Sequence, residues 1–108
     1  MSDNTRELLF ADEFYESLDD ILDYKSRSES DEHIRSFLTD LDYFIPKKIL
    51  SWPESHTEYK YKRTPNRRFR RAIFRKKYYI IYKVSDECVE IILIISSKRD
   101  LTKIFIQD

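Results

Sequence analysis

The sequence predicts an α+β protein in which an N-terminal helical hairpin packs on a small antiparallel β-sheet. Three observations predict this fold. Apolar residues recur at spacings of three and four along residues 12–25 and again along residues 31–45, a pattern typical of amphipathic helices. Residues 69–97 are instead rich in Val, Ile, Tyr and Phe, which favour strands. A polar gap at residues 85–87 separates two apolar runs and predicts an antiparallel hairpin.

Each predicted helix has a polar residue at its expected start. Asp12 is a suitable N-cap for the first helix, which runs to about Lys25 and turns most of its acidic residues away from its apolar face. Ser28 or Ser30 is suited to cap the second helix, and Pro46 is expected at or just past its end. Because only a few polar residues join the two segments, we expect an antiparallel helical hairpin.

The sheet is expected to be built on three consecutive strands, Phe69–Arg75, Tyr78–Val84 and Cys88–Ser97. The third strand is apolar on both faces from Ile91 to Ile95, which is typical of a strand in the middle of a sheet. Lys76 and Lys77 separate the first strand from the second.

Further segments have weaker patterns. Residues 6–10 fit either a strand or the start of the first helix, residues 58–63 fit an edge strand, and residues 101–106 fit a short C-terminal strand. Trp52 is expected in a loop, tucked over the edge of the core. At 108 residues the whole chain, 1–108, is expected to form one domain.

Charge is segregated along the chain although the formal net charge is zero. Residues 1–45 contain 13 acidic and 4 basic residues, whereas residues 46–83 contain 2 acidic and 13 basic residues. This segregation has two interpretations. One is a basic surface that binds a polyanion or an acidic partner, and the other is a set of acidic helices that neutralise a basic sheet within the fold.

Composition sets several negative expectations. No apolar run approaches the ~20 residues that span a bilayer, and the polar N-terminus lacks a signal-peptide pattern, so we expect a cytoplasmic protein without membrane contact. The two His and the one Cys share no metal-ligand spacing, and we expect neither a metal nor a cofactor. The sequence contains no glycine, which excludes a glycine-rich phosphate loop. Cys88 is expected to be a structural thiol on a strand.

The basic segment suggests contact with phosphate. Arginine pairs two phosphate oxygens at once, and RNA cleavage without a metal would also need a general base. His33 and His56 are the candidate bases, and each would equally suit a solvated or capping role. Tyrosines interleaved with the basic residues are suited either to stack on unpaired bases or to pack in the core; they are Tyr59, Tyr61, Tyr78, Tyr79 and Tyr82.

The order of elements resembles a known family. Two helices and a Trp52-Pro53-Glu54 loop precede the segment RRAIFRKKYYIIYKVSDECVEIILIISSKRDLTKIF, which spans residues 70–105. This segment resembles the C-terminal half of toxins of the RelE/ParE superfamily, and the resemblance covers nearly the whole chain. It implies a growth-arresting toxin of a type II toxin–antitoxin system, as in plasmid stabilization. It also implies a small acidic or amphipathic antitoxin that wraps the toxin in a hetero-oligomer.

The resemblance leaves the target open between two branches. In the branch that cleaves mRNA on the ribosome, Arg71 and Arg99 match basic positions, but Ile73, Tyr79 and Phe105 replace other functional residues. The branch that inhibits DNA gyrase needs no catalytic residues and commonly carries an arginine pair such as Arg70-Arg71, so the sequence leans to this branch. A non-toxic binding module with the same fold is a third alternative. The expected binding residues are Arg67, Arg68, Arg70, Lys77 and Lys98, and the expected catalytic residues, for a ribonuclease only, are Arg71, Arg75 and Arg99.

Overall fold

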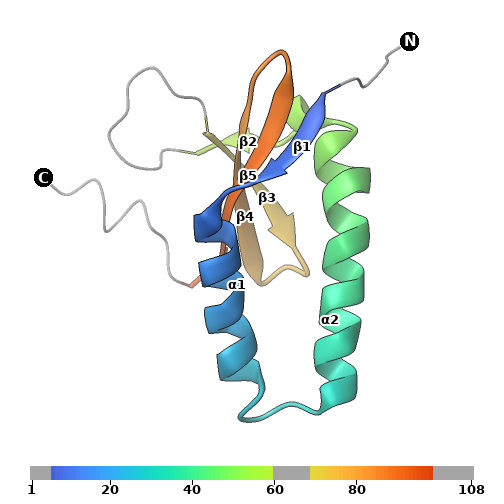
Figure 1. Cartoon of the computed structure of the whole chain (residues 1–108), viewed down its shortest axis with the longest axis vertical. Helices are drawn as coiled ribbons and strands as arrows, with labels where there is room; N and C mark the ends of the chain where they lie inside the picture. The colour runs from blue at the N-terminus through green and yellow to red at the C-terminus, as the bar shows by residue number, and fades with distance from the viewer. Residues whose placement is uncertain (1–5, 60–68, 99–108) are drawn as a thin grey trace, which may run out of the picture.

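Two helices lie on one face of a five-stranded β-sheet (Figure 1). The computed structural model describes residues 6–59 and 69–98. The predicted α+β class is confirmed at this level. The helices are α1 (Asp12–Lys25) and α2 (Asp31–Phe44), followed by a π-helical turn η1 (Ile45–Leu50) and a 3₁₀ turn η2 (Pro53–Ser55). The strands are β1 (Glu7–Phe10), β2 (Thr57–Glu58), β3 (Phe69–Phe74), β4 (Tyr78–Val84) and β5 (Cys88–Ser96).

The strand order is β1-β5-β4-β3-β2, and the sheet is mixed. Strands β2 to β5 pair antiparallel, as predicted, but β1 pairs parallel with β5. The expected all-antiparallel sheet is therefore wrong at this edge. The reason is that β5 is apolar on both faces and needs a neighbour on each side, and the segment that fills the second position is the ambiguous one at residues 6–10.

The start of α1 differs from expectation, whereas both ends of α2 agree with it. The N-cap of α1 is Ala11 rather than Asp12, because the Ala11 N–H still donates to the Ile91 carbonyl as the last rung of the β1–β5 pairing. Ser30 caps α2, its Oγ accepting from the His33 N–H at 3.2 Å. Pro46 lies just past the end of α2, as predicted, but the chain stays helical through η1, where the Ser51 N–H donates to the Pro46 carbonyl in the wider π register.

Tight turns form here without glycine. The β3–β4 turn places Arg75 and Lys76 in the left-handed region, with φ of 55° and 61°. Positive φ at both central residues is the type I′ geometry that matches the twist of a two-residue hairpin. β3 consequently ends at Phe74, one residue before its expected end. In the β4–β5 turn the Ser85 Oγ accepts hydrogen bonds from the Glu87 and Cys88 N–H groups.

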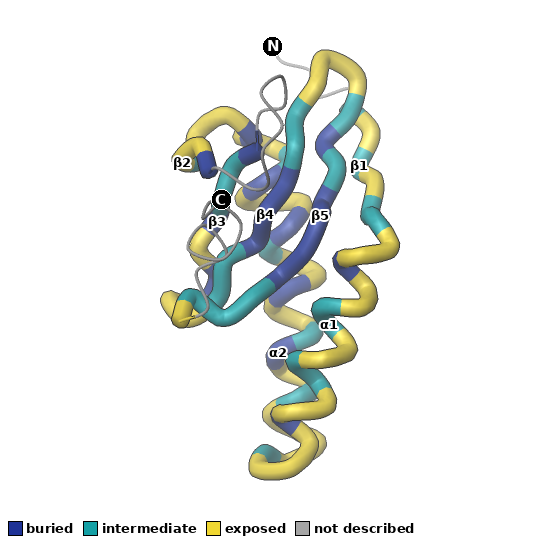
Figure 2. The backbone as a smooth tube through the Cα atoms, turned by 90° about the vertical axis from the view of Figure 1, so that its left-hand side faces the viewer, coloured by how far each residue is buried: buried dark blue, intermediate teal, exposed yellow. Residues whose placement is uncertain are grey.

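We call the helix-covered side of the sheet the inner face and the opposite side the outer face. Figure 2 shows that burial is concentrated in β4 and β5, while the helices expose their outward sides. Alternate residues of the central strands feed a buried cluster on each face. The inner-face cluster is Phe14, Phe37, Leu41, Ile45, Ile49, Ala72, Phe74, Ile80, Tyr82, Val89, Ile91 and Ile94. The outer-face cluster is Tyr59, Phe69, Ile81, Ile92 and Leu93.

Several predicted features differ from the structure or lie outside the described residues. Trp52 does not cover the core edge, since it is 70% exposed and Pro53 is buried instead. The expected edge strand at residues 58–63 coincides with β2 only at Glu58, Tyr59 follows outside the strand, and residues 60–63 lie outside the described residues. The C-terminal strand at residues 101–106 also lies outside them, and the single domain over 1–108 stays a prediction. No helix within residues 6–59 and 69–98 is long and apolar enough to cross a membrane.

Candidate functional site

Arg71 lies on the outer face of β3, half-buried. Its guanidinium carbon stands 4.6 Å from the centre of the Tyr79 ring, within the range of a cation–π contact. Its Nε is buried and has no hydrogen-bond partner among residues 6–59 and 69–98. Ile73 lies two residues along the same strand, directly opposite Tyr79, and is 50% exposed. Arg71, Ile73 and Tyr79 thus form a contiguous surface that we call the outer-face patch.

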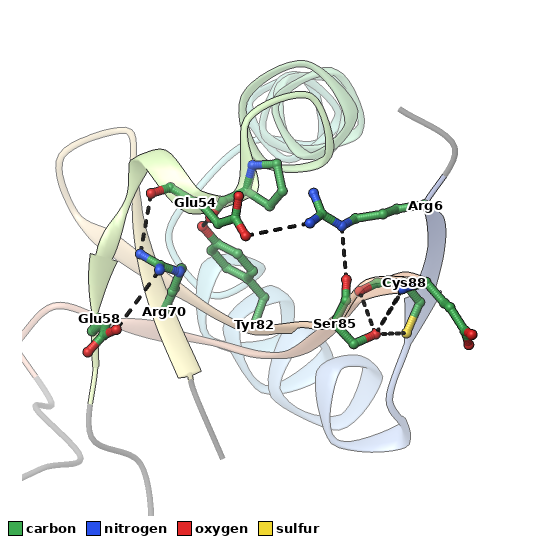
Figure 3. Close-up of polar contacts among 9 residues, drawn as sticks. Arg6, Glu54, Glu58, Arg70, Tyr82, Ser85 and Cys88 are labelled. Carbon is green, nitrogen blue, oxygen red and sulfur yellow. Dashed lines mark hydrogen bonds and ion pairs between the residues drawn. The ribbon is translucent and has the colours of Figure 1, made fainter. Parts of the chain in front are cut away.

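Arg70 points to the inner face and has a structural role. It sits at the start of β3, where the loop after α2 crosses the sheet (Figure 3). Its Nη1 donates to the His56 carbonyl at 2.6 Å and to the Glu54 carbonyl at 3.4 Å, and its Nη2 stands 3.9 Å from the Glu58 carboxylate. These contacts fix the loop to the sheet, so this cation is already engaged within the chain.

Tyr82 of β4 contacts the same loop. We call the contacts of Arg70 and Tyr82 with residues 53–58 the inner-face junction. Its hydroxyl donates to the Pro53 carbonyl at 2.5 Å, and its side chain is fully buried. Burial raises the pKa of the Tyr82 phenol. The positive charge of Arg70 lowers it, and the negative charge of the Glu54 carboxylate adds to the rise. The phenol therefore holds its proton and serves as a donor to the loop.

Arg75 is also engaged within the fold. Its Nε donates to the Asp40 carboxylate at 3.1 Å, and its Nη2 stands 3.4 Å from the Ser36 hydroxyl, both on α2. Its guanidinium lies 5.5 Å from the centre of the Phe37 ring. Arg71 lies within β3, whereas Arg75 lies in the turn after it. They also face different sides of the sheet, so the structure does not bring these two expected catalytic residues together.

Lys77 and Lys98 gather at one corner of the sheet. The Ser97 N–H donates to the Lys77 carbonyl at 2.8 Å, which holds the end of β5 against the β3–β4 turn. Lys76, in the same turn, is exposed like the other two lysines. We call Lys76, Lys77 and Lys98 the basic corner. The expected site residues Arg67, Arg68 and Arg99 lie outside the described residues.

The candidate bases lie elsewhere. The Nε2 of His56 is 2.7 Å from the Lys48 carbonyl, and its ring meets Tyr82 edge-on, so this imidazole belongs to the inner-face junction. His33 is exposed in the first turn of α2. Among the described residues, therefore, neither histidine stands on the face that carries Arg71. No group of three or more His, Cys, Asp or Glu within residues 6–59 and 69–98 is arranged to hold a metal ion.

The tyrosines divide between core and surface. Tyr59 and Tyr82 are buried, and Tyr78 lies under the buried Lys25 ammonium, 5.6 Å from its ring centre. Tyr79 is the tyrosine whose ring faces Arg71. Tyr61 lies outside the described residues. Of the described tyrosines with an expected stacking role, Tyr79 is thus the one placed on the outer face and half-exposed beside an arginine.

Sequence reasoning missed the polar junction around Tyr82. Besides Arg70, it draws in Arg6, whose Nε donates to the Ser85 carbonyl at 2.9 Å and whose Nη2 lies 3.5 Å from the Glu54 carboxylate (Figure 3). Arg6 precedes β1 and Glu54 lies in η2, so no local pattern links them. A signal was available in Tyr82 itself, because a tyrosine in a buried strand requires a partner for its hydroxyl.

Comparisons with known proteins do not assign the chain to a family: neither the scan of protein-family models nor the search of curated proteins gives a match.

Proposed function

We propose that this protein is a growth-arresting toxin of the RelE/ParE type that acts by binding a protein target, with DNA gyrase as the favoured target. A cognate antitoxin would inhibit the toxin by covering the surface that binds the target. The proposal starts from the resemblance of residues 70–105 to such toxins. The α+β arrangement, with two helices on one face of the sheet, is compatible with that resemblance.

The outer-face patch carries the preference for binding over cleavage. An arginine stacked on a tyrosine beside an exposed isoleucine combines residue types that anchor protein interfaces. RNA cleavage would need a base close to the phosphate-binding cation, and the described part of the chain places His56 at the inner-face junction instead. Arg75, the second expected catalytic cation, is bound to Asp40. A surface that binds a protein target without catalysing a reaction accounts for the exposed patch, the position of His56 and the pairing of Arg75.

Controlled expression in bacterial cells tests this function. We expect growth arrest with filamentation, and we expect the purified protein to inhibit supercoiling by gyrase in vitro. Rapid loss of translation with cleaved mRNA would contradict the gyrase assignment and support ribosome-dependent cleavage. Normal growth in the presence of well-folded protein would contradict the toxin function altogether and leave a non-toxic binding module.

Charge reversal at the patch tests the site. Arg71→Glu should abolish both growth arrest and gyrase inhibition, because it removes the stacked cation and puts an anion in its place. Arg27→Glu is the matched control, since Arg27 is exposed in the turn after α1 and contacts only the neighbouring Asp23 among the ion pairs of the described residues. Full toxicity of the Arg71 variant at normal expression would show that the patch is not the binding site.

A further inference from the structure

Strand β1 forms one edge of the sheet that the structure describes. Within residues 6–59 and 69–98 no strand pairs with its outer edge. On the side that faces β5, Glu7 and Ala11 donate their N–H groups to the carbonyls of Glu87 and Ile91, each at 2.9 Å. Successive residues of a strand turn their peptide groups to opposite sides, so Leu8 and Phe10 turn theirs away from β5. The edge thus presents backbone donors and acceptors to an incoming strand.

Apolar side chains lie exposed on both sides of this edge. Leu8 and Phe10 pack toward the inner-face cluster, so Leu9 between them lies on the outer face, where it is 41% exposed. On the inner side Tyr15 of α1 is 52% exposed, and its ring centre stands 6.0 Å from that of Phe10. A strand added next to β1 would set its alternate side chains against Leu9 on one face and against Tyr15 on the other.

Charge defines the chemistry of the incoming strand. α1 contains six acidic residues, and its one basic residue, Lys25, is 7% exposed and paired with Glu29. Asp12, Glu16 and Asp19 lie within one turn of Tyr15 along the helix, and all three are exposed. A second copy of this chain would bring its own acidic α1 against the first, which like-charge repulsion disfavours. A strand with basic residues on its inner side meets the opposite charge.

We propose that the β1 edge binds an extended segment of another protein in which apolar and basic residues alternate, and that this segment joins the sheet beside β1. The surface is separate from the outer-face patch, because β5 and β4 stand between β1 and β3. The proposal goes beyond the toxin function and does not depend on it.

A synthetic peptide that alternates lysine and valine is the probe. We expect it to bind the full chain and to slow hydrogen exchange at the Leu8 and Phe10 amides, whereas a peptide that alternates glutamate and valine does not bind. A lysine–valine peptide with a central proline should bind at least roughly tenfold more weakly, because proline cannot donate to the new strand pairing. Absence of binding, or binding without protection of these two amides, would overturn the proposal.

Two variants of α1 separate docking at the edge from general attraction to an acidic helix. Tyr15→Lys should weaken binding of the lysine–valine peptide by roughly tenfold, since it removes the aromatic ring that the inner-side lysines would contact and adds a like charge. Tyr24→Lys adds the same charge to the same helix at a tyrosine that is 71% exposed and far from β1, and should leave binding nearly unchanged. Equal loss of binding in both variants would show that net charge, not the edge, recruits the peptide.

Discussion

The two faces of the sheet are built from the same strands but differ in burial and in the contacts of their side chains. On the inner face Phe37 and Tyr82 are fully buried between helix, loop and sheet. On the outer face Ile73 is half-exposed, and Arg71 stacks on Tyr79 with a buried nitrogen that has no hydrogen-bond partner in the described part of the chain. Neighbouring arginines show the contrast best, because Arg70 is bound to the loop while Arg71, the next residue, is the one we propose for recognition. The inner face stabilises the fold, and the outer face is where we place function.

Truncation of the inner face should give the largest effect on stability. Phe37→Ala is expected to lower the free energy of unfolding by ~3–5 kcal/mol, because the ring is buried against Phe74 and Tyr78 and leaves a cavity. Ile73→Ala on the outer face should cost less than ~1 kcal/mol but weaken target binding. Urea denaturation of the two variants measures the difference. Similar losses of stability would break the distinction between the faces.

Loss of one hydroxyl at the junction should come next in size. Tyr82→Phe keeps the ring in the core but leaves the buried Pro53 carbonyl without its donor, and we expect a loss of ~1–3 kcal/mol in the free energy of unfolding. Tyr79→Phe is the matched change on the outer face and should leave stability nearly unchanged. Thermal and urea unfolding, followed by circular dichroism, compare the two variants.

The dependence of stability on alkaline pH tests the environment of the same phenol. The folded-state pKa of Tyr82 lies above the ordinary value of about 10, so the folded state resists ionisation of this group. Its contribution to stability is therefore fully present below pH ~10 and is lost as the pH rises above that value. The loss of stability with rising pH should be shallower in Tyr82→Phe than in the parent protein. Equal slopes in denaturant titrations above pH ~10 would contradict the assigned environment.

The ion pair beneath the β3–β4 turn should matter least. Arg75→Ala removes the contact with Asp40, in which both side chains are partly exposed, and is expected to cost less than ~1 kcal/mol. High salt should narrow the difference from the parent protein. If Arg75→Ala instead abolishes growth arrest at normal stability, Arg75 acts on the target and RNA cleavage regains support. Growth assays beside urea denaturation decide between these outcomes.

Local patterns were enough to predict the helices and the antiparallel strands. Phe14 and Phe37 belong to the apolar patterns of their segments, and both are buried in the inner-face cluster. The antiparallel pairing of β4 with β5, predicted from the polar gap at residues 85–87, is confirmed. The parallel pairing of β1 could not be predicted in this way, because it joins residues ~80 positions apart and residues 6–10 fit two structures equally well.

The site was harder to predict than the fold. Strand alternation separates Arg70 from Arg71, but only the tertiary structure reveals that the loop carbonyls of Glu54 and His56 occupy Arg70. In the same way, nothing near Arg75 in the sequence indicates that Asp40 is its partner. Long basic side chains reach across the fold, so a cluster of arginines in sequence need not form a cluster in space. The expected roles of Arg67, Arg68 and Arg99 stay predictions.

The parallel alignment of β1 with β5 has a consequence for how the chain is assembled during synthesis. The first strand leaves the ribosome early, yet it finds its neighbour only after β5, near the other end of the chain, has been made. Closing so long a loop is slow compared with zipping the β3–β4–β5 meander, so the N-terminal segment should dock last. Until then the nascent chain exposes one side of its most apolar strand, and this interval is when a chaperone or a co-translated partner would find it open.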